Sequence, residues 1–255
     1  MLSLKHPDMR SNALLNSYDA ERRPIGERVG KTSLVNMRSH ALILDEAIGL
    51  SPSKSEDANV EAMRQYFDPN DAEDGQRKRE EVDQALKTLD LEFYAHGAEV
   101  GWFYDLPYKG TYEHEDIANP QLNSDGNMEL CEYRPSTRPG NQLPHAWLEH
   151  TSAGKRMSTR ELPQYDKLAL LAFSPAWEKI DHPLLQRQIL GPGRNWRMLD
   201  DGLELQFRDV SAGGALIVRP DRIVAYLFRD DDMLKHPGAS TIVDKIIAQI
   251  LGLDG

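Results

Sequence analysis

Three short apolar segments in the second half of the chain constrain its fold most strongly. LALLAF (168–173), GALIVRP (214–220) and RIVAYLF (222–228) have the length of buried strands, and the last two are rich in β-branched residues. The turn former RPDR separates these last two segments and predicts a β-hairpin. A further apolar run, LPHAWLEH (143–150), is also of strand length.

Two helices are predicted among these strands. PAWEKIDHPLLQRQIL (175–190) has a helical pattern that breaks near Pro183. In STIVDKIIAQILGL (240–253) apolar residues recur at spacings of one, three and four behind Ser240, which we expect to cap the helix. Strands alternating with helices predict a small α/β layered structure.

The first half of the chain is predicted to be mostly helical. Asn12 is placed to cap a first helix, and Pro24 suits the first turn of a second. Further helices are expected over 59–67 and 76–97, and one strand over 97–106. The fold class is therefore mixed α/β. We predict a helical segment at 1–110, a polar surface linker at 111–128 and an α/β domain at 129–255.

Composition excludes several classes of function. The chain has 255 residues with 30 Lys+Arg against 41 Asp+Glu, a formal charge of −11, which argues against binding to nucleic acids or anionic membranes. Cys131 is the only cysteine, so a disulfide framework, a CxxC redox pair and a cysteine-rich zinc site are excluded within this sequence. Neither a transmembrane-length apolar run nor a secretory h-region occurs, and we expect a cytoplasmic protein.

Common catalytic and ligand-binding motifs give no site. GxGxxG, GxSxG and HExxH are absent, and Gly191-Pro192-Gly193 before Arg194 is interpreted as a loop. Three consecutive carboxylates at Asp230, Asp231 and Asp232 diverge in direction, which favours a solvated turn over a cation site.

Isolated chemistry-bearing side chains also favour structural roles. His145 and His150, with Glu149 between them, fall on opposite faces of a strand and make a poor metal pair, so hydrogen bonding is the expected role. The acids around Cys131 in ELCEY would raise the pKa of its thiol and weaken it as a nucleophile. The four tryptophans are expected to pack in the core: Trp102, Trp147, Trp177 and Trp196.

Three segments carry a family resemblance. LLNSYDAERRPIGERV (14–29) is similar to LLxSYxxERxPV. STRPGNQLPHAWLEH (136–150) resembles PGxRxPHxWL and is followed by Ser158, Thr159 and Leu162, which fit ST-x-x-L. GALIVRPDRIVAYLF (214–228) is close to GALLVRPDGxVAWR. In this order, the segments resemble the C-terminal part of FAD-dependent aromatic-ring hydroxylases, the phenol and 2,4-dichlorophenol monooxygenase group.

The resemblance implies a fold. The helices would be the end of a flavin-monooxygenase domain, and a thioredoxin-like α/β domain would begin near Glu129. Active thioredoxins have CxxC after the first core strand, where this chain has Ser174-Pro175-Ala176-Trp177. Without a second thiol the domain cannot exchange disulfides.

The resemblance also implies an activity, which is hydroxylation of a phenol using FAD, NAD(P)H and O2. The family's GxGxxG, DG and GDAAH motifs precede its SYxxERxP helix, so the resemblance implies that they lie outside this sequence, which has no GxGxxG and no GDAAH. We therefore predict the C-terminal portion of such an enzyme, inactive alone, either from a truncated gene or paired with a flavin-binding chain in trans.

No catalytic, cofactor-binding or metal-binding residue is assigned. Seven residues match the family's helix and hairpin motifs, and we expect them to support the structure: Tyr18, Glu21, Arg22, Pro24, Arg219, Pro220 and Asp221. Gln142 stands where the family often has a basic residue and receives no role.

Two alternative functions remain open. Besides the monooxygenase interpretation, the first alternative is a non-catalytic thioredoxin-like module for interaction or homodimerisation, and the second is an enzyme that acts through an unrecognised site. The first would leave the apolar residues of the 12–50 helices to be covered by another chain.

Overall fold

The mixed α/β fold predicted from the sequence is confirmed. The computed structural model describes residues 12–40, 43–68, 70, 73–106, 118–191, 194–199, 207 and 209–253. Among these residues, no helix is both long enough and apolar enough to cross a membrane.

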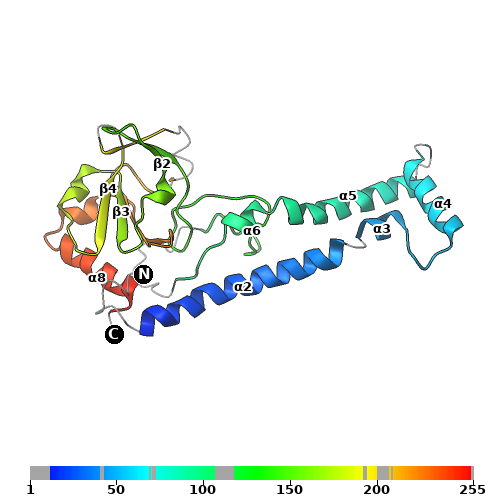
Figure 1. Cartoon of the computed structure of the whole chain (residues 1–255), viewed down its shortest axis with the longest axis horizontal. Helices are drawn as coiled ribbons and strands as arrows, with labels where there is room; N and C mark the ends of the chain where they lie inside the picture. Colours follow the sequence, from blue (N-terminus) through cyan, green and yellow to red (C-terminus); the bar gives the residue numbers. More distant parts are fainter. Residues whose placement is uncertain are drawn as a thin grey trace. The chain divides into compact units, whose positions relative to one another are not determined.

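The described helices of the first hundred residues run in chain order before any strand (Figure 1). They are α2 (Asn12–His40), α3 (Ile43–Ile48), α4 (Glu56–Phe67), α5 (Asp74–Phe93) and α6 (His96–Val100).

Helix α2 is continuous through Pro24, so the prediction of two helices separated there was wrong. A proline inside a helix removes one backbone hydrogen bond and crowds the preceding turn. In a helix of 29 residues, the cooperative hydrogen bonds on both sides outweigh that loss. The side chain of Asn12, the predicted cap, lies outside the described part of the structure.

Hydrogen bonds of side chains to the backbone cap α4 and join α5 to α3 and α4. The Oγ of Ser55 accepts a bond from Ala58 N (3.3 Å) and caps α4. From α5, Lys78 Nζ donates to Ile48 O (2.9 Å) and Arg79 Nη1 donates to Tyr66 O (3.2 Å). These contacts satisfy carbonyls at the ends of α3 and α4.

The strand predicted over 97–106 does not form. Residues 96–100 are the short helix α6, and Gly101 N bonds to Gly97 O (2.9 Å). The chain then extends, and Phe103 forms a single antiparallel bridge to Asn141. The segment predicted as a strand therefore combines a helix end with an extended segment.

The second half forms two sheets. The four-stranded sheet has the order β4-β3-β6-β7, and the three-stranded sheet has the order β2-β1-β5. The strands are β1 (Trp147–His150), β2 (Arg156–Ser158), β3 (Leu168–Ala172), β4 (Leu185–Ile189), β5 (Trp196–Met198), β6 (Ala215–Val218) and β7 (Val224–Phe228). Strands β3 and β4 are parallel, whereas the β3–β6 and β6–β7 pairs are antiparallel. The predicted hairpin is confirmed as β6–β7.

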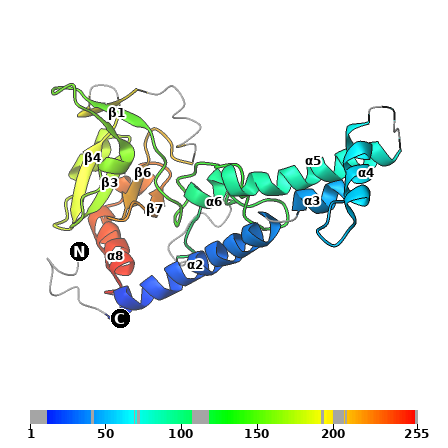
Figure 2. The ribbon, with the colours of Figure 1, turned by 45° about the vertical axis from the view of Figure 1, so that its right-hand side comes forward.

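Each face of the four-stranded sheet is covered. Leu168, Leu170 and Ala172 of β3 pack with the apolar face of α8 (Ala239–Leu251), which lies beside β3 and β4 in Figure 1. Ala169 and Leu171 pack in a second cluster with residues of β1 and β5, and Figure 2 shows β1 away from α8. Because side chains alternate along a strand, β3 is buried on both faces.

Two expectations about helices in this half were wrong. Only Pro175–Lys179 is helical in the predicted 175–190 segment, as the 3-10 helix η4, and β4 follows. Parallel pairing with β3 determines the structure there, and the apolar residues of β4 face the core. Helix α8 begins at Ala239 after Gly238, so Ser240 lies inside the first turn instead of capping it.

The contacts divide the chain into two compact units. As far as the structure describes them, the sheet unit comprises Met1–Arg23, Gly97–Glu129 and Tyr133–Gly255. The helical unit comprises Pro24–His96 and Leu130–Glu132. The sequence-based boundaries at 111–128 stay a prediction.

Candidate functional site

A buried ion pair joins two of the segments that carry the resemblance. Glu21 of α2 has only 4% of its side-chain surface exposed, although it is a carboxylate. Arg219, which follows β6, donates from Nη1 to Glu21 Oε1 (2.7 Å) and from Nη2 to Oε2 (2.8 Å). This bidentate geometry is the strongest form of a charge-assisted hydrogen bond. Both residues lie in the sheet unit.

The hairpin turn orients Arg219. Its backbone N donates to Ile223 O (2.8 Å), and its carbonyl accepts from Arg222 N (2.9 Å). The Asp221 carboxylate accepts bonds from Arg219 Nε (3.1 Å) and Nη2 (2.7 Å). The guanidinium is therefore held by two carboxylates, one from its own turn and one from α2.

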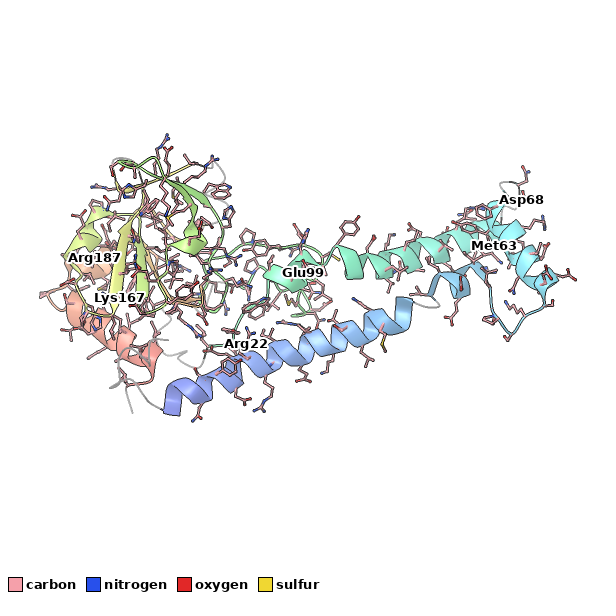
Figure 3. The ribbon with its side chains drawn as sticks, viewed as in Figure 1. Arg22, Met63, Asp68, Glu99, Lys167 and Arg187 are labelled. Carbon is pink, nitrogen blue, oxygen red and sulfur yellow. The ribbon has the colours of Figure 1, made fainter. Side chains whose placement is uncertain are left out.

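Tyr104 lies against the Arg219 guanidinium and also contacts a second arginine, Arg22. Its ring is buried, its centroid lies 5.7 Å from the Arg219 guanidinium carbon, and its hydroxyl accepts a bond from Arg22 Nη1 (3.0 Å). Arg22, labelled in Figure 3, also lies over the Trp102 ring at 5.7 Å. Burial raises the pKa of Tyr104, while its bond to Arg22 opposes this and raises the pKa of Arg22.

The remaining motif segment, 136–150, contacts Tyr104 through its backbone. Tyr104 N donates to Gly140 O (2.9 Å), and Gly140 N donates to Val224 O of β7 (2.8 Å). Gly140 has a φ of +93°, and a Cβ there would lie 2.2 Å from Tyr104 O. Only glycine fits this position. Through Arg22, Arg219 and Gly140, all three motif segments contact Tyr104.

We call Glu21, Arg22, Tyr104, Arg219 and Asp221 the Glu21 cluster. It contains two carboxylates, two guanidiniums and one phenol. Hydrogen bonds join Arg219 to both carboxylates and Arg22 to Tyr104, and the contact of the Arg219 guanidinium with the Tyr104 ring links the two groups. Two acids and two cations balance in charge. None of the bonds described above pairs the phenol with a carboxylate, so these contacts form no nucleophile–base pair, and the geometry is that of a packing contact.

The remaining residues of these motifs lie differently. Tyr18 is exposed, with 66% of its surface accessible, and Pro24 is also exposed. Gln142 accepts a hydrogen bond from Arg160 Nη2 through Oε1, so it binds a basic residue within the same unit.

The two histidines form separate hydrogen bonds. His145 Nδ1 lies 2.7 Å from Ser158 Oγ, and His150 Nδ1 lies 3.1 Å from Ser152 Oγ. Each ring also makes an edge-on contact with a tryptophan, Trp147 and Trp196 respectively. Within the described ranges, no three His, Cys, Asp or Glu side chains converge as metal ligands.

The acidic run at Asp230–Asp232 forms a turn. Asp230 Oδ1 accepts a bond from Asp232 N (2.9 Å), and Asp232 begins the 3-10 helix η5 (Asp232–Lys235). Asp231 Oδ2 accepts a bond from Ser174 Oγ (3.4 Å). Cys131 is exposed, and Pro192 and Gly193 of the glycine-containing loop lie outside the described residues.

The tryptophans differ in burial. Trp177 is fully buried and its Nε1 donates to Gly213 O (2.8 Å), while Trp196 Nε1 donates to Gln188 Oε1 (2.8 Å). Trp102 is half-buried, whereas Trp147 is 41% exposed, so the expectation of core packing was wrong for Trp147. Its aromatic surface is shared with Arg156, whose guanidinium carbon lies 5.6 Å from the ring.

A depression of about 510 Å³ lies in the helical unit. Its lining combines apolar Leu50, Val60 and Met63 with Lys54 and Asn59, among others. Lys54 Nζ donates to Gly49 O (2.6 Å), and Asn59 bonds to the backbone of Ser51. The amino group of Lys54 and the side-chain amide of Asn59 therefore bind backbone atoms of the 49–55 loop and hold it together.

Sequence reasoning missed three residues that organise the sheet unit. Tyr104 and Gly140 are described above, and Asp209 Oδ2 accepts bonds from Ser136 Oγ (3.0 Å) and Thr137 N (3.2 Å). Gly140 had a local signal, because glycine after proline marks a turn. Tyr104 and Asp209 had none, since their partners lie far along the chain.

The amino-acid sequence is similar to those of two known monooxygenases. The chain is 28% identical over 235 residues to phenol 2-monooxygenase of Pseudomonas sp. (strain EST1001), a match covering 88% of the chain and 36% of the relative. It is 28% identical over 228 residues to 2,4-dichlorophenol 6-monooxygenase of Cupriavidus pinatubonensis, covering 84% of the chain and 36% of the relative. No family model matches the chain.

Two solved structures of flavin-containing proteins also resemble the chain. The flavin-dependent monooxygenase PieE, crystallised with FAD and substrate, matches with a TM-score of 0.77 and 25% identity, over 98% of this chain and 42% of that protein. Aklavinone-11 hydroxylase matches with a TM-score of 0.51 and 20% identity, over 98% of this chain and 37% of that protein, which supports the fold alone. The predicted resemblance to the C-terminal part of FAD-dependent aromatic hydroxylases is confirmed. The chain spans about a third of the length of the relatives it matches.

Proposed function

We propose that this chain forms the C-terminal part of an FAD- and NAD(P)H-dependent monooxygenase that hydroxylates a phenolic or other aromatic substrate. The names of the phenol and dichlorophenol monooxygenases support the substrate class. The flavin-dependent monooxygenase with the TM-score of 0.77 supports the cofactor. In this proposal the described residues contribute packing, and the chain alone is inactive.

The Glu21 cluster is the observation that carries the proposal. Glu21 comes from the segment that resembles SYxxERxP, and Arg219 comes from the segment that resembles the VRPD hairpin. Two motifs 198 residues apart in the chain meet in one buried bidentate pair. We infer that this pair holds the start of α2 against the β6–β7 hairpin within the sheet unit.

The described residues do not fit FAD as a group held by this chain alone. Arg219 is engaged by two carboxylates and is not available for a pyrophosphate, while Arg22 donates to the Tyr104 hydroxyl. The glycine-rich turn that normally cradles a pyrophosphate is also absent from the sequence. Flavin would supply the oxygen chemistry of the complete enzyme, and we assign no step of it to residues of this chain.

We also propose that the part from Glu129 onward is a thioredoxin-like domain without redox function. The order β4-β3-β6-β7, its strand directions and the terminal α8 support this topology. After β3, Ser174 caps η4 and Trp177 is buried, so these residues serve the core. Residues 174–177, which follow β3, contain no cysteine.

Flavin titration of the purified 255-residue chain tests the proposal. We expect no saturable quenching of FAD fluorescence and no NAD(P)H oxidation when phenol is added. Full-length phenol 2-monooxygenase, assayed in parallel, is the positive control. A chain that purifies with bound flavin, or that hydroxylates phenol alone, would contradict the proposal.

One observation favours a second candidate, a module for association. Val29, Leu34 and Met37 on α2 are 57%, 43% and 67% exposed. Exposed apolar side chains close together on one helix are typical of a surface that another chain covers. Sedimentation at several concentrations tests this candidate. Self-association that is lost in Val29→Ser/Met37→Ser supports homodimerisation, and a monomer at all concentrations rejects it.

A further inference from the structure

Two buried asparagines in the sheet unit each leave one amide atom without a partner. Asn119 is 7% exposed and Asn141 is 5% exposed. Over the ranges that the structure describes, Asn119 Nδ2 and Asn141 Oδ1 make no hydrogen bond. One atom is a donor and the other an acceptor, and both belong to side chains that face each other.

The orientation of both amides is fixed by their other atoms. Asn119 Oδ1 accepts a bond from Gln121 N (3.1 Å), so rotating this amide would place two N–H donors against each other. Asn141 Nδ2 lies 3.5 Å from the same oxygen, and rotating that amide would oppose two oxygens. The unpartnered atoms therefore cannot be exchanged by reassigning either amide.

Leaving both atoms unpaired would be costly. A buried polar group without a partner destabilises the fold, and native proteins pair nearly all such groups or bridge them with water. The 3.5 Å contact is at the long limit of a hydrogen bond, which indicates amides held slightly too far apart for a closed pair. The surrounding backbone sets this spacing, because Asn141 N and O are bonded to Arg138 O and Val224 N.

We propose that one buried water molecule bridges these amides, accepting a hydrogen bond from Asn119 Nδ2 and donating one to Asn141 Oδ1. A neutral ligand that both accepts and donates matches one free donor and one free acceptor. A cation would be repelled by the amide N–H groups, and an anion by the carbonyl oxygen. The water ties the 118–122 segment to the Arg138–Gln142 turn that packs on Tyr104.

A high-resolution crystal structure of the 255-residue chain tests this site. We expect a discrete density peak within about 2.7–3.2 Å of both Asn119 Nδ2 and Asn141 Oδ1. A direct bond between these two atoms, or a peak that contacts only one of them, would overturn the proposal.

NMR gives an independent test in solution. In the natural chain the Asn119 side-chain amide should show a cross-peak to a long-lived water. That cross-peak should be lost in Asn141→Ala and retained in Asn127→Ala, which changes an exposed asparagine. Absence of the cross-peak in the natural chain, or its persistence in Asn141→Ala, would contradict the bridge. Should Asn141→Ala fail to fold, the cross-peak of the natural chain and the crystal structure still decide the question.

Discussion

Strands β3 and β6 of the sheet unit bury every residue along their length, whereas the described helices of the helical unit bury little more than small side chains. Among the described residues of 24–96, the buried apolar side chains are Ala62, Val82, Ala85 and Ala95. Val60, Phe67 and Leu86 are instead exposed on the same helices. Burial of apolar surface is the main favourable term in folding, so the sheet unit is the more self-sufficient of the two.

The two units also differ in whether their ion pairs are buried or exposed. The Glu21–Arg219 pair of the sheet unit is buried, while Arg64–Glu61, Arg77–Glu81 and Lys87–Asp83 of the helical unit are exposed pairs within one helix. Exposed pairs of this kind contribute little to stability. These ion pairs of the helical unit therefore support single helices, whereas the Glu21–Arg219 pair of the sheet unit joins distant segments.

Replacing glycine by alanine should have opposite effects in the two units. Gly140→Ala forces a Cβ to 2.2 Å from Tyr104 O at a φ of +93°, and should lower the free energy of unfolding by at least about 3 kcal/mol. Gly30→Ala on α2 has open space and should add about 0.5–1 kcal/mol of helix stability. Urea denaturation and far-ultraviolet circular dichroism measure both effects.

Gly126→Ala is the matched control, because Gly126 has a φ of +76° but open space for a Cβ. It should cost only about 1–2 kcal/mol. Equal losses at Gly140 and Gly126 would show that the close approach to Tyr104 contributes nothing.

Removing the Glu21 charge should be the next largest effect. Glu21→Gln removes one of the two carboxylates that the described residues place on the partly buried Arg219, and should cost about 2–3 kcal/mol. Asp19→Asn on the same helix breaks an exposed pair with Arg23 and should cost at most about 0.5 kcal/mol. Thermal or urea unfolding distinguishes these values. Indistinguishable variants would mean that the buried pair is no stronger than a surface pair.

Relieving the hairpin turn should stabilise the sheet unit. Arg222 has a φ of +69°, the left-handed conformation that favours glycine, and the family hairpin motif has glycine at this position. Arg222→Gly should therefore raise the free energy of unfolding by about 1 kcal/mol. Loss of stability in urea denaturation would show that the Arg222 side chain makes a contact worth more than the strain.

The smallest expected effect is on the pH dependence of stability. Burial raises the folded-state pKa of Tyr104, so the folded chain retains a proton that the unfolded chain releases above about pH 10. The contribution is complete below that pH, and is lost as the pH rises toward the folded-state pKa. Tyr104→Phe should make stability fall less steeply between about pH 9.5 and 11. An unchanged slope would indicate that the Tyr104 hydroxyl is not desolvated in solution.

The sheet unit was largely predictable from its sequence because its strands are short, apolar and bounded by turn formers. The hairpin and the terminal helix follow from such local patterns. The region of 175–190 did not, because parallel pairing with β3 overrides a helical periodicity near Pro183. Continuity of α2 through Pro24 was missed because proline indicates a helix start more often than an interior position.

The Glu21 cluster was only partly predictable. The motifs drew attention to Glu21, Arg22 and Arg219. That Glu21 pairs with Arg219 depends on contact between segments nearly 200 residues apart, and periodicity has no information on such contacts. Tyr104 looked like part of a strand, and its true neighbours come from α2, the hairpin and Gly140.

A double-mutant cycle between Glu21 and Arg219 tests the central claim, that the two motifs are held together by one buried pair. The cycle compares the unfolding free energies of the natural chain, Glu21→Gln, Arg219→Met and the double variant. We predict a coupling energy of about 1–3 kcal/mol, with the double variant much less destabilised than the sum of the single changes. Additive effects, with coupling below about 0.5 kcal/mol, would contradict the claim.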